Sequence, residues 1–355
     1  MPALCRLARP DRYVVSAWNL ADDPWVCRYW LDLFASFPER MGRHLREDGL
    51  AGPEFETRWP AFCAEYDSGI QAIRQRVNRE GDLRTIDLCR FRSSLLNRFG
   101  YPDPYAGVKR RENDLAANLY PRVIDRIDRT PPSQRWDTLF RGLLAGNLFD
   151  LGCPKTIDMY HNGQIDFFDA LRNLPREPWA IDHTPALLEN LRNKPIWHQS
   201  LIFVDNAGAD ITLGVLPLAR EMARAGMRVV LAANGAPALN DITLAELGPL
   251  LGRLATGDAL LAGMMADGRL VTVDSGGDTP LIDLSRVSDA CNAVAAKSDL
   301  IVLEGMGRGV ESNWTESFTC DVWRVALLKD QTVADWIGAR LFDGVCRFEP
   351  ADRSV

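Results

Sequence analysis

The stretch "IFVDNAGADI" (residues 202–211) combines apolar and polar residues in an order that is typical of a sheet edge. An apolar segment comes first, Asp205 and Asn206 follow it directly, and Gly208 precedes a helical pattern. This order predicts a strand, a tight turn and a helix. It places a carboxylate and a carboxamide at the carboxyl end of the strand, where open α/β sheets bind their ligands.

Further apolar runs repeat this arrangement toward the C-terminus. Together with "SLIFV" (200–204), we predict strands in "RVVLAA" (228–233), "RLVTV" (269–273), "DLIVLE" (299–304) and "VWRVALLK" (322–329). Short apolar strands that alternate with amphipathic helices indicate a sheet covered on both faces. We therefore predict a three-layer α/β fold with a doubly wound, mostly parallel sheet. Right-handed connections place the carboxyl ends of these strands on one rim.

The chain before residue 200 has a different character. Patterns such as "RYWLDLFASFPERMGRHL" (28–45) and "FETRWPAFCAEYDSGIQAIRQRV" (55–77) place apolar residues at helical spacing among charged ones. Several prolines between residues 173 and 199 indicate a connecting segment. We expect a mainly helical region over 1–172, a connector over 173–199 and the α/β domain over 200–355.

Composition excludes several classes of protein. The 355 residues are 46% hydrophobic, which is enough for a large core, and the net charge of −7 argues against a nucleic-acid-binding face. No segment approaches the roughly 20 apolar residues of a membrane span, and the N-terminus lacks the apolar stretch of a signal peptide. Eight cysteines without paired spacing favour reduced thiols. We expect a cytoplasmic protein without nucleic-acid or membrane partners; its oligomeric state stays open.

Polar residues follow the predicted strands one after another. One aspartate after a strand is more often a helix cap than a ligand, but five strands that end in polar residues favour a binding site. Asp205, Asn206 and Asp241 form an oxygen-only set that suits Mg²⁺ or Mn²⁺ bound together with a phosphate. No cysteine or histidine joins them, which argues against zinc.

Three motifs resemble a known family. "FVDNAGAD" (203–210), "LAANGAPALND" (231–241) and above all "EGMGR" (304–308) resemble the metal-dependent damage-control phosphatases, or domain of unknown function 89. The last motif is similar to the branch that includes stand-alone plant members and the phosphatase half of pantothenate-kinase-like fusion proteins. "YPDPYAGVKRREN" (101–113) and "GLLAGNLFDLG" (142–152) resemble helical-half motifs of the same branch.

The resemblance implies a phosphatase that uses a divalent ion (Mn, Co, Ni or Mg) held by Asp205, Asn206 and Asp241. The implied substrate is a small phosphorylated metabolite, 4′-phosphopantetheine or a related, possibly oxidised, phosphate ester. We expect catalytic roles for Asp205, Asp241 and Lys329, with Asp205 acting either as a metal ligand or as a nucleophile. Substrate contacts are expected from a wider set: Asn147, Asp150, Asn234, Asn240, Glu304, Gly305, Gly307 and Arg308.

Lys329 and backbone amides near Gly305 and Gly307 are expected to neutralise phosphate oxygens. Each of these residues also has a simpler interpretation. Lys329 is then a solvated strand end, Arg308 forms an ion pair with Glu304, and Asn147 and Asp150 join two helices. Glu112 and Asn113 fall in a charged run that is typical of a solvated helical face.

Two other functional classes fit the same pattern less well. A nucleotide-cofactor transferase, such as an S-adenosylmethionine-dependent methyltransferase, would carry a glycine-rich turn after its first strand, and "DNAGAD" is a poor substitute. A non-catalytic scaffold has no need for five polar strand ends. The sequence therefore favours a metal-dependent phosphatase.

Overall fold

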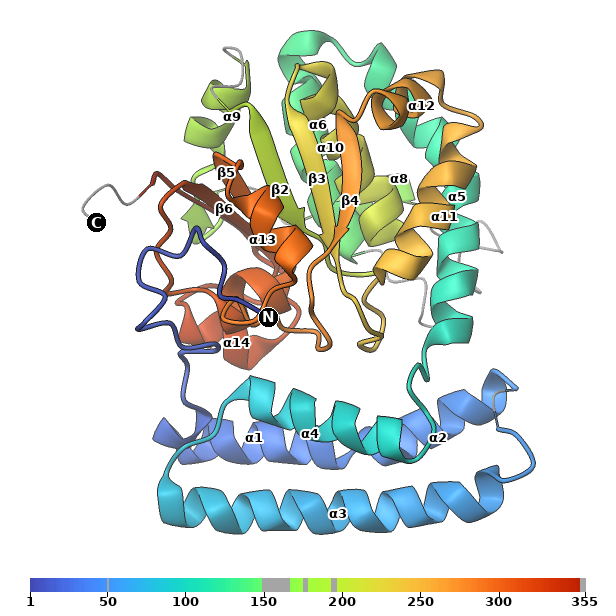
Figure 1. Cartoon of the computed structure of the whole chain (residues 1–355), viewed down its shortest axis with the longest axis vertical. Helices are drawn as coiled ribbons and strands as arrows, with labels where there is room; N and C mark the ends of the chain where they lie inside the picture. The colour runs from blue at the N-terminus through green and yellow to red at the C-terminus, as the bar shows by residue number, and fades with distance from the viewer. Residues whose placement is uncertain (50, 149–166, 175–177, 193–196, 352–355) are drawn as a thin grey trace.

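A seven-stranded sheet forms the centre of the computed structural model, which describes residues 1–49, 51–148, 167–174, 178–192 and 197–351 (Figure 1). The strand order is β1-β7-β6-β5-β2-β3-β4, and all neighbours are parallel except β6 and β7. The strands are β1 (Ile181–Asp182), β2 (Gln199–Phe203), β3 (Arg228–Ala233), β4 (Leu270–Asp274), β5 (Leu300–Glu304), β6 (Asp321–Leu327) and β7 (Gly344–Glu349). The prediction of a doubly wound, mostly parallel sheet is confirmed.

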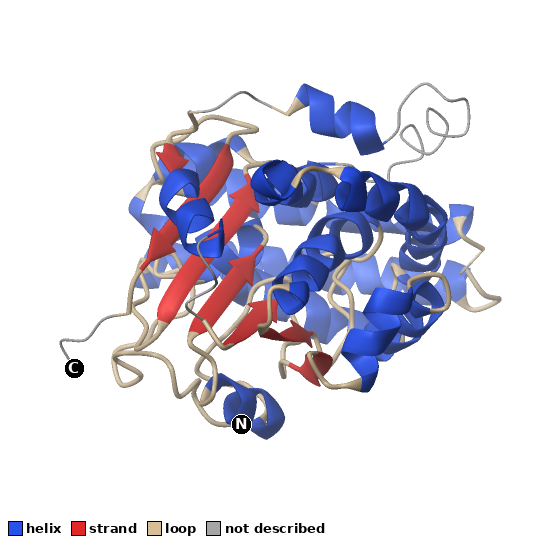
Figure 2. Ribbon diagram, turned by 90° about the horizontal axis from the view of Figure 1, so that it is seen from above, coloured by secondary structure: helices blue, strands red, loops and turns tan. Residues whose placement is uncertain are grey.

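Both faces of the sheet are buried, and successive residues of a strand enter different cores. Leu201 and Phe203 pack with residues of α13 (Asp289–Ala295) and with Leu4 and Leu7 of the N-terminal segment. Ile202, between them, faces the opposite layer of helices (Figure 2). That layer contains α5 (Ala106–Arg129), α6 (Pro132–Leu148), α8 (Phe167–Asn173), α9 (Thr184–Arg192), α10 (Leu216–Arg224), α11 (Leu244–Ala255) and α12 (Ala259–Ala266). The alternation follows from the two-residue period of a strand.

The order of the strands reverses between β2 and β5. The chain proceeds from β2 outward through β3 and β4, and then returns to place β5 on the other side of β2. In open α/β sheets, such a reversal leaves a crevice at the carboxyl ends of the two central strands, because their connections leave in opposite directions. The topology therefore places a potential ligand site between the ends of β2 and β5.

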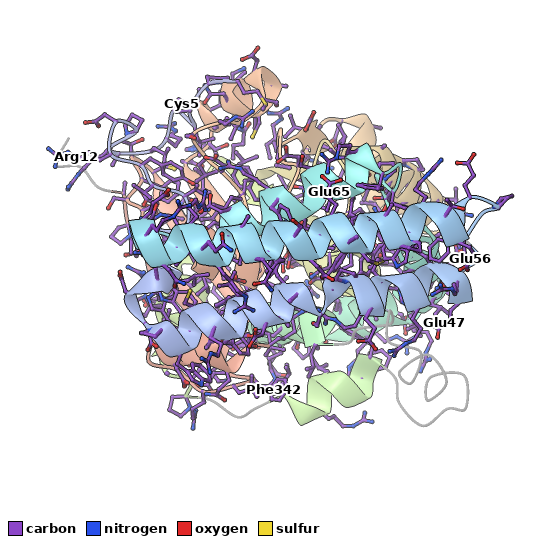
Figure 3. All side chains as sticks on the ribbon, turned by 90° about the horizontal axis from the view of Figure 1, so that it is seen from below. Cys5, Arg12, Glu47, Glu56, Glu65 and Phe342 are labelled. Atoms are coloured by element: carbon purple, nitrogen blue, oxygen red, sulfur yellow. The ribbon has the colours of Figure 1, made fainter. Side chains whose placement is uncertain are left out.

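A layer of helices lies across this carboxyl edge of the sheet (Figure 1). It consists of the short 3-10 helix η1 (Leu20–Asp22), α1 (Pro24–Ala35), α2 (Phe37–Glu47), α3 (Phe55–Glu80) and α4 (Thr85–Arg98). Seen from below, α3 runs beside α1 and α2 across this end of the molecule (Figure 3). The aromatic core of this helical layer also contains Val310, Leu328 and Val333 from the α/β part of the chain. Val333 belongs to α14 (Gln331–Trp336). The helical layer therefore covers the edge of the sheet.

Several features go beyond the sequence predictions. The helical pattern over 28–45 is divided at Ser36, because Pro38 has no N–H to continue the hydrogen bonds of the first helix and lies in the first turn of the second. The segment expected as a connector, 173–199, contains α9 and β1, and the antiparallel strand β7 was not predicted. Among the described helices, none is long and apolar enough to cross a membrane.

Candidate active site

The crevice at the strand reversal gathers most of the predicted site residues. Asp205 follows β2, Asp241 lies in the loop after β3, and Glu304 is the last residue of β5. Backbone hydrogen bonds tie the first two segments together, since the Ile242 N–H donates to the carbonyl of Asp205 at 3.0 Å. Asn206 and Asp241 form an isolated antiparallel bridge at the same place. The structure therefore brings the three predicted metal ligands side by side.

Two π-helices border the crevice: η2 (Asp210–Val215) after β2 and η3 (Met306–Ser312) after β5. Such wide turns are uncommon and often occur at functional sites. η2 lies tightly against α6, where a Cβ atom at Gly146 would come within 3.0 Å of the Ala209 carbonyl oxygen and 3.1 Å of Gly214. Only glycines permit this approach, which brings the end of α6 to the site.

Gly305 turns the chain from β5 into η3 directly beside Asp205. Its φ of +92° favours glycine, and a Cβ atom there would collide with the Asp205 carboxylate. The Gly305 N–H donates to the carbonyl of Val325 at 3.0 Å. This amide is therefore used by the sheet, and the expectation that it binds a phosphate oxygen is wrong. A Cβ atom at Gly307 would lie 2.6 Å from the Pro280 carbonyl oxygen, which shows that this glycine is needed for close packing.

Arg308 connects two of the predicted ligands. Its guanidinium is almost completely buried and forms ion pairs with Asp205 and with Asp241, the latter at 2.7 Å. Burial opposes the charge, but Asp241 and Asp205 outweigh this effect and raise the pKa of Arg308. The alternative pairing of Arg308 with Glu304 is replaced by these two contacts. Two carboxylates thus converge on one positive group at the crevice.

Asn234 completes this side of the site. Its Nδ2 donates to Asp241 at 3.0 Å, and its Oδ1 accepts from Arg308 at 3.4 Å. Burial raises the pKa of Asp241 to about 7, although Arg308 acts in the opposite direction. Asn240 contributes a backbone group instead, because its carbonyl accepts the N–H of Ala207 at 2.9 Å.

Asp205, Asp210 and Glu304 form a buried acidic cluster in which one oxygen of each lies within 4.8 Å of the others. Burial first, and then the charge of Asp205, raises the pKa of Asp210 to about 6. Burial and the neighbouring charge of Asp210 raise the pKa of Glu304 well above its usual range. Glu304 also accepts the Asp205 N–H at 2.9 Å. Glu304 was expected among the substrate-binding residues and Asp210 was missed.

Asp210 organises its neighbours through one carboxylate oxygen. This Oδ2 accepts from the Nδ2 of Asn147 and the Nδ2 of Asn206, both at 2.9 Å, and from the Asn206 N–H at 3.1 Å. Its Oδ1 is buried and receives no hydrogen bond from the described part of the chain. Lys329, whose side chain is exposed, donates from Nζ to the Asn147 carbonyl at 3.1 Å. Asn147 and Lys329 therefore lie at the rim of the cluster, whereas Asp150 is outside the described residues.

Residues of α5 support the turn after β2 from behind. The Gly208 N–H donates to Asn113 Oδ1 at 2.7 Å, and a Cβ atom at Gly208 would come within 2.7 Å of Glu112. Lys109 is fully buried between Asp103 and Glu246, at 3.0 and 2.8 Å. The interpretation of this run as a solvated helical face is wrong. The resemblance of "YPDPYAGVKRREN" (101–113) to a family motif was the feature of the sequence that could have indicated a role for this run near the site.

The balance of charge fits a divalent cation. Asp205, Asp210, Asp241 and Glu304 bring four carboxyl groups together, and the cations that act on them are Arg308, Lys329 and Lys109. The raised pKa values of Asp210, Asp241 and Glu304 show that these cations do not fully compensate the buried acids. The donor atoms are all oxygens, and the unpartnered Asp210 Oδ1 lies within the cluster. Hard cations such as Mg²⁺ and Mn²⁺ prefer such ligands.

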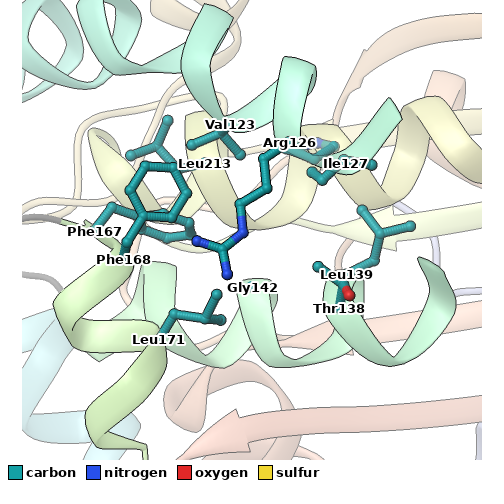
Figure 4. A pocket seen from close by; sticks show the side chains of 11 residues that line it. Val123, Arg126, Ile127, Thr138, Leu139, Gly142, Phe167, Phe168, Leu171 and Leu213 are labelled. Carbon is teal, nitrogen blue, oxygen red and sulfur yellow. The ribbon is translucent and has the colours of Figure 1, made fainter. Parts of the chain in front are cut away.

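An apolar hollow between α5, α6 and α8 lies apart from this crevice (Figure 4). Val123, Leu139 and Phe167 help to line it, and Arg126 lies over the ring of Phe168 at 4.9 Å. Its volume open to a water-sized molecule is about 10 Å³, which is close to the minimum for one water. It cannot hold a metabolite, and none of the predicted site residues lines it.

Comparison with known proteins gives a consistent result. The family model described as "Damage-control phosphatase ARMT1-like domain" matches residues 62–345. The Arabidopsis thaliana protein named damage-control phosphatase At2g17340 is 38% identical over 325 residues, covering 90% of this chain and 87% of its own. The Mus musculus protein named 4′-phosphopantetheine phosphatase is 30% identical over 394 residues. That match covers 97% of this chain, which spans about half (48%) of the mouse protein.

A solved structure shows the same fold. The crystal structure of a DUF89 family protein from Pyrococcus horikoshii matches with a TM-score of 0.65 at 17% identity. The match covers 90% of this chain and 96% of that chain. The similarity therefore includes the helical layer as well as the sheet.

The site predicts that a divalent ion stabilises the folded protein. We expect Mn²⁺ at about 100 times its Kd to raise the free energy of unfolding of the wild type by about 2.7 kcal/mol. Asp205→Asn should lose this gain, because it removes the carboxylate shared by the acidic cluster and the Arg308 bridge. Asp267→Asn, which changes an exposed carboxylate paired with Arg269, is the matched control. Chemical denaturation with and without the ion measures both; an undiminished gain in Asp205→Asn would exclude this ligand.

Proposed function

The chain belongs to the damage-control phosphatase family with an ARMT1-like domain, and we propose that it hydrolyses 4′-phosphopantetheine or a closely related phosphate monoester. The observation that carries this proposal is the convergence of Asp205 and Asp241 at the strand reversal, beside a cluster of further buried carboxylates. The similarity to the mouse protein named 4′-phosphopantetheine phosphatase supports the substrate class. None of the relatives described above is named as a methyltransferase, and the transferase alternative has no support.

We assign the direct metal ligands to Asp205, Asn206 and Asp241. The two carboxylates already face one cationic group. The Nδ2 of Asn206 donates to Asp205 and Asp210, and its Oδ1 accepts no hydrogen bond from the described residues. A Mn²⁺, Co²⁺, Ni²⁺ or Mg²⁺ ion bound there would supply Lewis-acid polarisation of the phosphate and activation of the attacking water. Two further carboxylates hold these ligands in place: Glu304 accepts the backbone N–H of Asp205, and Asp210 accepts the backbone N–H of Asn206.

Asp205 acts as a ligand rather than a nucleophile in this proposal. Its Oδ1 pairs with Arg308 and its Oδ2 accepts from Asn206 at 2.9 Å. Both contacts hold the carboxylate in one orientation, and a fixed carboxylate suits a metal ligand. The same contacts orient the carboxylate toward the crevice.

Lys329 is the proposed phosphate-binding cation. It lies at the rim of the acidic cluster, and its ammonium already lies close enough to offset the charge of Asp210. A phosphate dianion beside a metal with two carboxylate ligands needs a further positive partner, and a lysine on a flexible stem supplies an adaptable point charge. The helical layer closes the same edge and provides a wall for the organic part of the substrate.

A screen of phosphate esters tests the proposed activity. The screen includes 4′-phosphopantetheine, its oxidised forms, sugar phosphates and an aryl phosphate, each with Mn²⁺, Co²⁺, Ni²⁺ and Mg²⁺. We expect turnover to vanish after chelation and to return with one of these ions, with the highest kcat/KM for the pantetheine esters. Full activity after exhaustive chelation, or no turnover of any ester, would refute the proposal.

Lys329→Met should lower kcat/KM for a phosphate ester by about 10²-fold, which is the scale of losing one preorganised charge-stabilising group. Metal affinity should change little, because Lys329 contacts a carbonyl rather than a proposed ligand. Lys297→Met is the matched control, because Lys297 is exposed and lies just before the first residue of β5, whereas the site lies at the last residue of this strand. Steady-state kinetics and metal titration measure the two effects. Unchanged kcat/KM in Lys329→Met would move the phosphate-binding role to another cation.

A further inference from the structure

Glu311 is a buried carboxyl group that the proposed metal and phosphate contacts do not use. It lies in η3, three residues after Arg308, and only 6% of the residue is exposed. Among the described residues, no hydrogen bond or ion pair reaches its carboxyl group. Its oxygens do not belong to the fully enclosed, unpartnered atoms of the described residues, so they stay open to a partner that binds from outside.

The surroundings of Glu311 belong to the junction between the site and the helical layer. Its neighbour Val310 packs into the core of that layer together with Leu328. Asp330, directly after Lys329, caps α14 by accepting the Val333 N–H at 3.1 Å, and it also accepts the hydroxyl of Tyr29 from α1. These contacts bring η3, the end of β6 and α1 to one junction.

The charged groups that act on Glu311 come from the loop after β6 and from the centre of the site. Burial raises the pKa of Glu311 to about 8, and Asp330 and then Asp205 add to the effect. Asp330 directly follows Lys329 and Asp205 lies at the centre of the site, so Glu311 is within electrostatic range of both places. At pH 7 it is mainly protonated, so it offers one hydrogen-bond donor and one acceptor without a net charge.

We propose that Glu311 is a specificity-determining residue that hydrogen-bonds a hydroxyl or amide group in the alcohol portion of the substrate. Glu311 lies in η3, which borders the crevice, and follows Val310, which packs into the helical layer proposed to enclose the organic part of the substrate. The neighbouring acids Asp330 and Asp205 disfavour a second negative charge there. The substrate class is thus a phosphate monoester whose alcohol is neutral and polar near the phosphate. This inference rests on the proposed phosphatase function.

Two substitutions separate hydrogen bonding from packing. Glu311→Leu keeps the approximate size of the side chain but removes both hydrogen-bonding atoms, whereas Glu311→Gln keeps a neutral donor and acceptor. The probes are 4′-phosphopantetheine, which carries a hydroxyl and an amide close to its phosphate, and p-nitrophenyl phosphate, which carries neither. Kinetics are measured at pH 7 with the metal-loaded protein, and urea denaturation checks that each variant is folded.

We expect Glu311→Leu to lower kcat/KM for 4′-phosphopantetheine by about tenfold or more, the scale of one or two lost hydrogen bonds. Turnover of p-nitrophenyl phosphate should stay within about twofold, and Glu311→Gln should retain both activities. An equal loss on both substrates in a folded Glu311→Leu protein, or no loss on either, would overturn the proposal. A purely structural role would change both substrates alike.

The failure of this inference can be told apart from failure of the proposed function. If the wild type turns over the aryl ester but not 4′-phosphopantetheine, the proposed substrate is wrong. The role of Glu311 is then decided by sn-glycerol 3-phosphate and propyl phosphate as substrates or competitive inhibitors. A preference for the hydroxylated ester that disappears in Glu311→Leu supports the proposal, and one that persists, or no preference, refutes it. A wild type inactive on every ester would overturn both.

Discussion

Four buried carboxyl groups gather at one edge of the sheet, and the rest of the site must compensate their negative charge. Unpaired charge is costly to bury, and burial accordingly raises the pKa of Asp210, Asp241 and Glu304. Arg308 compensates part of this charge by joining Asp205 to Asp241. A divalent cation bound by oxygen ligands would compensate more of this charge, and the family to which the chain belongs is metal-dependent.

The fold creates this concentration of charge through its topology. The reversal of strand order opens a crevice between β2 and β5, and Gly305 lets the chain pass beside Asp205 where any side chain would collide. η2 and η3 then aim Asp210 and Arg308 inward from the two sides of the crevice. The helical layer packs on the same edge, so the chemistry and the enclosing wall come from opposite halves of the chain.

The sequence predicts the sheet well because its strands are short, apolar and bounded by turn residues. The same strand ends led to Asp205, Asn206 and Asp241, which the structure brings together. Asp210 was missed because it stands at the start of a helical pattern and not directly after a strand. The turn between β2 and η2 places its carboxylate beside the backbone N–H of Asn206. The pairing of Arg308 is a long-range contact that no local pattern encodes. The roles of Asp210 and Arg308 therefore depend on which segments meet in three dimensions.

The central claim is that Asp205 and Asp241 hold a metal ion next to a phosphate-binding lysine. Anomalous diffraction from crystals of the protein grown with Mn²⁺ and inorganic phosphate tests this claim most directly. The account predicts one Mn²⁺ peak ligated by both carboxylates and by the side-chain oxygen of Asn206, with a phosphate oxygen in contact with Lys329. An ion ligated without Asp205 and Asp241, or a phosphate bound away from Lys329, would contradict it.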